Sequence, residues 1–298
     1  MKKLITIIII LTLLLTILAI FIDMKDTPTV ETIKPTEQTS STISILPKTI
    51  LPGDPIFITI NSTSTPKEIL FDGKKLPIFE YDRKTHAFIG IDFNEKNFEH
   101  SVTVTLSNGE VLIQKITLSP REKIELPLGI PDKLGGNTTA AEKALLANLA
   151  KENAILNAVK TDATTLWTSA FGEPLKNMQI TDGYGYDRKT VNSTIVHKGT
   201  DLRAVEGTQV FAMNDGVVKI AQTFIVYGNA IIIDHGEGVQ TLYMHLSKMN
   251  VKAGESVKKG QMLGLSGKTG YAESPHLHIS VKIDKISINP MTFLGFFR

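Results

Sequence analysis

Four of the seven histidines in this chain lie in its C-terminal third with one aspartate, and their spacing limits how that region can fold. His197 and Asp201 are four residues apart, so they share a face of either a helical turn or a strand. His276 and His278 are two residues apart, which places both side chains on one face of a strand. A fold that brings these residues together with His245 would form a metal site.

The residue types favour zinc in such a site. The chain has no cysteine, so nitrogen and oxygen atoms must supply every ligand. Two imidazoles and one carboxylate leave the fourth tetrahedral position of zinc to water, an arrangement typical of catalytic rather than structural sites. The spacing does not decide which of His276 and His278 would be the ligand.

The N-terminus predicts a membrane anchor. Lys2 and Lys3 precede an apolar run over residues 4–22. As a helix the run is about 28 Å long, close to the ~30 Å hydrocarbon core of a bilayer. A signal peptide usually has a shorter apolar region and a small-residue cleavage site. We therefore expect residues 1–23 to stay uncleaved, with the N-terminus in the cytoplasm and the rest of the chain extracytoplasmic; cleavage would make the protein secreted.

The next two segments differ in pattern. Residues 24–44 are rich in Thr, Ser, Glu and Pro without a hydrophobic period, which predicts a flexible linker. Residues 45–118 show short alternating apolar runs and an Asn108-Gly109 hairpin signal, which predict a small all-β, sandwich-like domain. His86 and His100 stand alone there and are expected at the surface.

A connector over residues 119–166 follows, with a capping box at Thr139-Ala-Ala-Glu142 that predicts a helix over 139–160. Short strands with glycine punctuation then recur over 167–298. We expect Thr241, Tyr243 and His245 to share one face of their strand. The predicted fold class is mainly β with one connector helix and a C-terminal antiparallel sheet. The strands expected in the C-terminal segment are 209–212, 216–221, 230–234, 240–245 and 277–283.

Residues 167–296 resemble the lysostaphin/LytM-type zinc endopeptidases, metallopeptidase family twenty-three. The resemblance rests on motifs that occur in the same order, while the segments upstream resemble membrane-anchored members that carry a β domain before the peptidase. The main motifs are His197-Lys-Gly-Thr-Asp201, Gly207-Thr-Gln-Val-Phe-Ala212, Tyr243-Met-His-Leu-Ser247 and Ser274-Pro-His-Leu-His278.

The resemblance implies roles for these residues. His197, Asp201 and His278 would bind one zinc ion per chain, and His245 and His276 would act on the water and on the transition state. The stretch from Asp182 to Arg188 departs from the family's common Ser-x-Phe-Gly-x-Arg pattern. Tyr184 and Tyr186 in this loop are candidates for contact with the substrate or its oxyanion. The alternative is that they are ordinary exposed loop tyrosines without a role in the site.

The expected function is hydrolysis of peptide bonds in peptidoglycan stem or cross-link peptides, in the cell envelope. The net charge of +2 is too small to suggest a nucleic-acid partner. The alternative is a non-enzymatic activator of cell-wall amidases that uses the same groove, as relatives without zinc ligands do. The β domain is a candidate site for a regulatory protein partner.

Overall fold

The structure is a computed structural model that describes residues 40–298. Residues 41–298 form one compact unit. The predicted anchor over 1–23 and most of the predicted linker over 24–44 lie outside the described residues. Within residues 40–298, no helix has both the length and the apolar character needed to cross a membrane.

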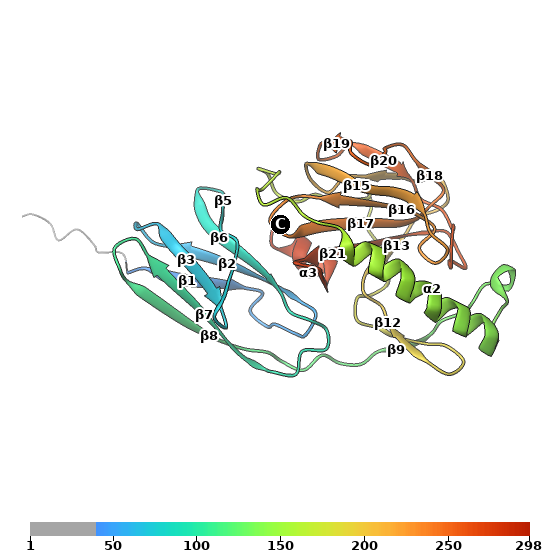
Figure 1. Ribbon diagram of the computed structural model, residues 1–298, viewed down its shortest axis with the longest axis horizontal. Coiled ribbons are helices and arrows are strands. Elements are labelled where there is room, and N and C mark those ends of the chain that lie inside the picture. Colours follow the sequence, from blue (N-terminus) through green and yellow to red (C-terminus); the bar gives the residue numbers. More distant parts are fainter. Residues whose placement is uncertain (1–39) are drawn as a thin grey trace, which may run out of the picture. The chain divides into compact units, whose positions relative to one another are not determined.

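The first part of this unit consists of two four-stranded antiparallel sheets (Figure 1). Their strand orders are β1-β2-β6-β5 and β4-β3-β7-β8. The predicted hairpin at Asn108-Gly109 is present and joins β7 to β8, with Gly109 at a φ of 88°. The strands are β1 (Thr42–Leu46), β2 (Pro55–Asn61), β3 (Pro66–Phe71), β4 (Lys74–Lys75), β5 (Phe79–Tyr81), β6 (Lys84–Gly90), β7 (Glu99–Leu106) and β8 (Val111–Thr117).

Strand β2 is buried on both of its faces. Ile56, Ile58 and Ile60 belong to a hydrophobic cluster that both N-terminal sheets share. Phe57 points to the other face and joins a cluster that includes residues of the C-terminal sheet. The apolar alternation thus places β2 between two cores, because successive side chains of a strand point to opposite faces.

The two histidines of this region are buried, so the expectation that they lie at the surface is wrong. His86 stacks on Phe57 with ring centroids 4.5 Å apart, and its Nδ1 lies 3.0 Å from the hydroxyl of Thr59. His100 lies with its Nδ1 2.6 Å from the carboxylate of Asp72. Each ring has a polar partner for Nδ1, as buried imidazoles usually do, whereas Nε2 of His100 has none among the described residues.

The connector contains β9 (Glu125–Pro127), the 3₁₀ turn η1 (Asp132–Leu134) and helix α2 (Thr139–Ala158). The helix occupies the region where a helix over 139–160 is expected, and Thr138 caps it by accepting a hydrogen bond from the N–H of Ala141. Leu156 of α2 packs against Leu242 and Met244 of the C-terminal sheet. In Figure 1, α2 crosses the strands of that sheet.

The C-terminal region is built on an eight-stranded sheet. Seven of its strands follow the order β10-β13-β21-β17-β16-β15-β19, and the eighth, β22, pairs with β21. Two three-stranded sheets, β12-β11-β9 and β14-β20-β18, flank it, and α3 (Pro290–Gly295) follows the last strand. The strands are β10 (Ile180–Asp182), β11 (Asp187–Lys189), β12 (Thr194–Val196), β13 (Thr200–Arg203), β14 (Gln209–Phe211), β15 (Gly216–Thr223), β16 (Asn229–Asp234), β17 (Val239–Leu246), β18 (Lys248–Met249), β19 (Ser256–Val257), β20 (Met262–Leu265), β21 (His276–Ile283) and β22 (Ile286–Ile288).

An aromatic layer joins the N-terminal sheets to the C-terminal sheet. Phe88 lies 5.1 Å from Phe57, 6.3 Å from Trp167 and 5.6 Å from Phe293 between ring centroids. All four belong to the hydrophobic cluster that also contains the core of the C-terminal sheet. The C-terminal core is therefore completed by side chains from the N-terminal sheets.

Candidate metal centre

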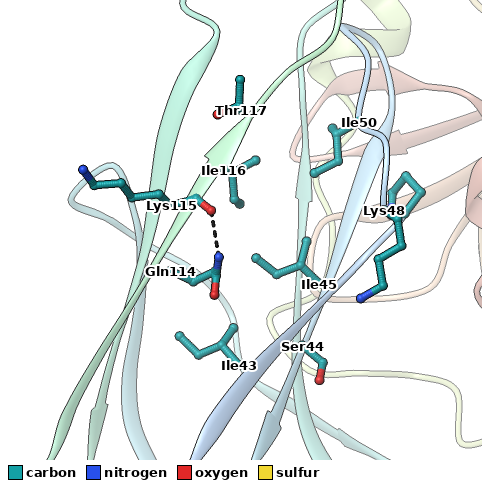
Figure 2. A pocket seen from close by; sticks show the side chains of 10 residues that line it. Ile43, Ser44, Ile45, Lys48, Ile50, Gln114, Lys115, Ile116 and Thr117 are labelled. Carbon is teal, nitrogen blue, oxygen red and sulfur yellow. Dashed lines mark hydrogen bonds between the residues drawn. The ribbon is translucent and has the colours of Figure 1, made fainter.

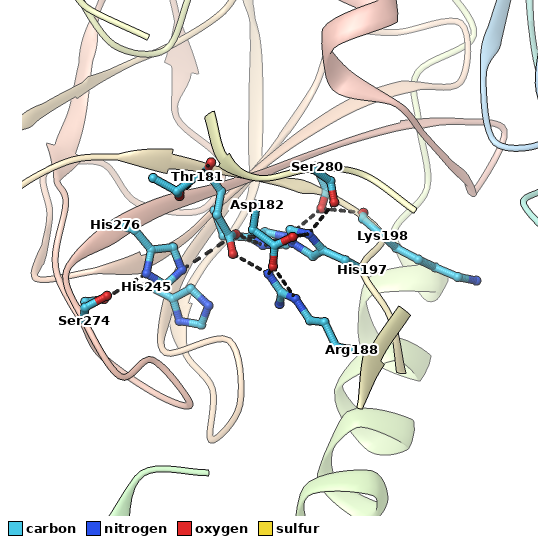
Figure 3. Close-up of polar contacts among 12 residues, drawn as sticks. Thr181, Asp182, Arg188, His197, Lys198, His245, Ser274, His276 and Ser280 are labelled. Carbon is cyan, nitrogen blue, oxygen red and sulfur yellow. Dashed lines mark hydrogen bonds and ion pairs between the residues drawn. The ribbon is translucent and has the colours of Figure 1, made fainter. Parts of the chain in front are cut away.

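Three of the predicted site residues, His197, Asp201 and His278, converge on one face of the paired strands β13 and β21, and Figure 3 shows the polar contacts around them. Asp201 and His278 are directly opposite each other in the antiparallel pair of these strands, so their side chains share a face. His197 precedes β13 by a short turn. Nε2 of His197 lies 3.0 Å from Nδ1 of His278 and 3.3 Å from Oδ1 of Asp201, and Nδ1 of His278 lies 2.7 Å from the same oxygen.

These distances fit a metal ion held by all three atoms. A four-coordinate ion with ligands at about 2.0–2.1 Å separates its ligand atoms by about 3.3 Å. The three separations in the structure are 2.7, 3.0 and 3.3 Å, close to that value. Two nitrogens and one carboxylate oxygen suit a divalent metal of intermediate softness such as zinc. The triad supplies three ligand atoms, so a fourth ligand would have to come from elsewhere.

The turn between His197 and Asp201 needs glycine at position 199. A Cβ at Gly199 would lie 2.3 Å from Nε2 of His278 and 2.6 Å from the carbonyl oxygen of Ile279. The backbone of the turn therefore packs directly on the imidazole of the facing strand, and no larger residue fits without moving it.

Hydrogen bonds on the far side of each imidazole fix its orientation. Nδ1 of His197 lies 2.9 Å from the carbonyl oxygen of Gly183, which can only accept, so this nitrogen carries the proton. Ser280 donates its hydroxyl to the carbonyl of Lys198 at 3.0 Å and accepts from Nε2 of His278 at 3.0 Å. The other nitrogen of each ring is left as a lone pair directed at the centre, the arrangement that metal-binding histidines have.

The electrostatics of Asp201 and His278 agree with this arrangement. For His197, burial lowers the pKa, but hydrogen bonds with Asp182 and Asp201 outweigh it and raise the pKa above its ordinary value. Burial raises the pKa of Asp201, but the imidazoles of His197 and His278 beside it outweigh this effect and hold the pKa well below its usual range. Burial lowers the pKa of His278 to about 4, although Asp201 acts in the opposite direction. Asp201 is thus ionised and His278 neutral at neutral pH, the states in which both can bind a metal.

Arg188 on β11 was not among the predicted site residues, yet it contacts the centre. Its guanidinium binds the Oδ2 atom of Asp201 and, at 2.8 Å from Nε, the Oδ2 atom of Asp182. Asp182 in turn lies 3.6 Å from Nδ1 of His197. The sequence offered one signal for this role, since Arg188 ends the stretch that departs from the family pattern.

His245 and His276 lie beside the triad. The centroid of the His245 ring is 4.8 Å from that of His276 and 6.0 Å from that of His278. Nδ1 of His245 donates to the carbonyl of Thr269 at 2.9 Å, and Nδ1 of His276 donates to that of Ser274 at 2.9 Å. Nε2 of His276 lies 3.7 Å from Oδ1 of Asp201. The structure therefore brings all five predicted histidine and aspartate residues together.

His245 reaches this face through an unusual backbone. Its φ is +62°, in the left-handed region that non-glycine residues rarely adopt. Met244 pairs with His278. Tyr243 belongs to the core instead, where its hydroxyl accepts from the N–H of Met213 rather than from a site residue. The expectation that Tyr243 and His245 share a face is therefore wrong, because the left-handed residue interrupts the alternation of β17.

The two loop tyrosines lie in different places. Tyr184 is buried and donates its hydroxyl to the carbonyl of Ser287 at 2.8 Å, with its ring against Gly53 of the N-terminal region. Burial raises the pKa of its phenol. The structure does not bring Tyr184 to the histidines, so its hydroxyl is unsuited to contact a substrate. Tyr186 is partly exposed, and its ring covers Gly183, whose carbonyl binds His197.

Comparison with known proteins places this site in a family. Residues 195–290 match the profile of peptidase family M23. The peptidoglycan DD-endopeptidase ShyA of Vibrio cholerae is 42% identical over 95 residues, which cover 32% of this chain and 22% of that protein. The chain spans between 20% and 28% of the length of the curated relatives it matches first.

Two solved structures are also similar. The catalytic domain of lysostaphin from Staphylococcus simulans is 36% identical, with 40% of this chain and 93% of that domain covered and a TM-score of 0.38. A peptidase M23 from Pseudomonas aeruginosa is 22% identical, with 85% of this chain and 97% of that chain covered and a TM-score of 0.60. The second likeness shows that the fold of residues beyond the matched segment also has a known counterpart.

Proposed function

Because residues 195–290 make this chain a member of peptidase family M23, we propose that it is a zinc-dependent endopeptidase that hydrolyses peptide bonds in peptidoglycan. The observation that carries the proposal is the meeting of His197, Asp201 and His278 within 4.8 Å, with His245 and His276 beside them. This set has the ligands for one zinc ion and two further imidazoles for proton transfer.

Zinc bound to the triad would supply a Lewis acid and a water of lowered pKa. The residues of the chain supply the rest. The Nδ1 atoms of His245 and His276 are tied to backbone carbonyls, which leaves each Nε2 atom free toward the reacting groups. Burial, with His276 and His278 close by, lowers the pKa of His245 to about 3 and keeps it neutral. One imidazole accepts the water proton at its Nε2 lone pair, and the other, when protonated at both ring nitrogens, donates from Nε2 to the oxyanion or to the leaving amine.

Peptidoglycan as substrate is supported by the similarity to ShyA of Vibrio cholerae, a peptidoglycan DD-endopeptidase. The bond cut would lie in stem or cross-link peptides. The apolar run over residues 4–22 supports a membrane-anchored protein whose C-terminal region acts on the wall outside the membrane. We assign residues 45–118 to an N-terminal β domain, 119–166 to the connector and 167–298 to the peptidase.

The rival function is activation of amidases without catalysis. Relatives that act in this way have lost metal ligands, whereas this chain has a complete set. The two functions differ in one consequence: an activator would not need His278, while the proposed enzyme cannot bind its metal without it.

The experiment uses residues 41–298, purified, loaded with zinc and incubated with purified sacculi. Mass spectrometry of the released fragments should find new amino and carboxyl termini within peptides. The His278→Ala variant and chelated wild type should release none, and Lys252→Ala, an exposed lysine, should behave as wild type. Release of sugar fragments only, or full activity of His278→Ala, would overturn the proposal.

A further inference from the structure

Two cavities are candidates for ligand binding in residues 40–298. One, of about 290 Å³, opens between β1 and β8 and is lined by residues of the N-terminal sheets such as Ile43, Ile45 and Ile116 (Figure 2). Two lysines, Lys48 and Lys115, also line it, but no site histidine does, and its strands belong to the N-terminal sheets. The other, of about 400 Å³, is lined from the segment before β10 and from β13 to β14, including Lys176, Arg203 and Val205.

The second cavity includes Arg203, which lies two positions along β13 from Asp201 of the metal centre. Arg203 is directly opposite His276 in the pairing of β13 with β21, just as Asp201 is opposite His278. Opposite residues of an antiparallel pair share a face, with Cβ atoms about 4.5–5.5 Å apart. Arg203 therefore stands on the same face of the sheet as His276 and Asp201. An extended peptide advances about 3.3 Å per residue, so this separation corresponds to one or two residues of a bound substrate.

The charged residues of the cavity are all cations. Lys176 and Arg203 line it, and no carboxylate does. Neither cation takes part in an ion pair within residues 40–298. Glu173, the nearest acid before Lys176, is bound to Arg298 at 2.6 Å. The cavity thus presents two positive charges that no described side chain neutralises.

The remaining lining is partly apolar. Leu175 and Phe211 form its inner part, and Val205 is 76% exposed at its rim. A large apolar side chain with that exposure gains from a ligand that covers it. The cavity therefore combines a cationic side with an aliphatic contact, which matches a residue that has a short hydrocarbon body and a carboxylate.

We propose that this cavity is a substrate subsite that binds a carboxylate-bearing residue one or two positions from the scissile bond. The proposal rests on the proposed function, because it assigns the cavity to the same substrate. Arg203 would bind the carboxylate through its planar guanidinium, which matches two carboxylate oxygens at once. Lys176 adds a second, more mobile charge. The free carboxylate thereby orients the peptide along β13 toward His276.

The test compares two peptides that differ in one group. Both peptides carry the same cleavable bond. One has a free carboxylate on a residue one or two positions from that bond, and the other has a carboxamide at the same place. For the wild type we expect KM to be about tenfold lower for the carboxylate, in line with a charge-assisted hydrogen bond, with similar kcat. Arg203→Gln and Lys176→Gln should raise KM for the carboxylate alone, by about threefold to tenfold.

Lys252→Gln, which removes an exposed lysine outside the cavity, is the control and should leave both KM values unchanged. Dissociation constants of both peptides are also measured on His276→Ala, so that the subsite is tested even if neither peptide is cleaved. Absence of cleavage with a preserved preference for the carboxylate would refute the proposed function but support the subsite. Equal binding of the two peptides, or equal effects of Arg203→Gln on both, would overturn the subsite.

Discussion

The backbone N–H of Tyr227 donates a hydrogen bond to the carboxylate of Glu152 at 3.1 Å. The same carboxylate accepts from the N–H groups of Ile225 and Val226 at 2.7 and 3.0 Å. The carbonyl of Tyr227 accepts in turn from the N–H of His245 at 3.0 Å. Helix α2 therefore supports, through one buried carboxylate, the loop that holds the left-handed backbone of His245.

Replacing Glu152 should consequently affect both stability and catalysis. In Glu152→Gln one carboxylate oxygen becomes an N–H donor, which leaves at least one loop N–H unpaired and costs about 1–3 kcal/mol of unfolding free energy. We also expect kcat to fall about tenfold, because His245 loses its fixed position. Urea unfolding and peptide hydrolysis measure the two effects. Lys151→Gln, one residue away and exposed, is the control; a variant with lost stability but full kcat would contradict the link to His245.

Ser280 should contribute to metal affinity without touching the metal. Its hydroxyl accepts from Nε2 of His278 at 3.0 Å and holds the ring with its other nitrogen toward Asp201. Ser280→Ala should weaken zinc binding by about tenfold to a hundredfold, as loss of such partners does elsewhere. Competition with a chromophoric chelator measures the affinity. Ser247→Ala removes a comparable serine whose hydroxyl binds the carbonyl of Ser266, and an equal loss there would show that the effect is not specific.

Lys282 should make stability depend on pH. It is 5% exposed and donates to Asn157 at 2.7 Å, no carboxylate of residues 40–298 pairs with it, and burial lowers its pKa to about 8. The unfolded chain keeps a lysine pKa of about 10.4, so the unfolded state binds the proton more tightly. The charge therefore opposes folding fully below pH 8, and this cost declines between about pH 8 and 10.4.

Lys282→Met removes that charge. We expect it to raise the unfolding free energy by about 1–3 kcal/mol at pH 7, and the gain should shrink as the pH approaches 10. Urea unfolding at both pH values measures the difference, and Lys248→Met, at an exposed position, should show none. A gain that is constant with pH would mean that packing rather than charge is its cause.

Phe88 should stabilise both halves of the compact unit. Its ring lies between Phe57 of the N-terminal sheets and Trp167 and Phe293 of the C-terminal region. Phe88→Ala should lower the unfolding free energy by about 3–5 kcal/mol. Both halves should still unfold in one common transition, at a lower denaturant concentration. Fluorescence of Trp167, the single tryptophan, is compared with far-ultraviolet circular dichroism. Val111→Ala, at a 54% exposed position, is the control; two separate transitions, only one of them shifted, would contradict a shared core.

The residue spacing predicted the two-residue step from His276 to His278 in one strand, and the structure contains it. The turn residues at Asn108-Gly109 likewise predicted the hairpin between β7 and β8. Such features depend on neighbours in the chain or on the period of a strand. The assignment of His197, Asp201 and His278 as ligands came from the family resemblance, because Asp201 meets His278 through the pairing of β13 with the distant strand β21.

Features that depend on distant segments escaped the prediction. His245 changes face because its φ is +62°, which the alternating pattern of β17 does not reveal. His86 is buried because the second face of its sheet meets the aromatic layer, and Tyr184 is buried because its hydroxyl binds Ser287. Arg188 reaches Asp201 only through the placement of β11 beside β12. Tertiary packing decides each of these.

The aromatic layer around Phe88 and Trp167 has a consequence for how the proposed wall-degrading activity is contained. A protease that cut the chain between β8 and α2 would separate the partners of this layer and expose apolar rings on both pieces. Neither piece would keep a complete core, so degradation would produce no free-standing hydrolase that could diffuse along the wall. We therefore expect a chain cut in this connector to lose the proposed activity once its two pieces separate.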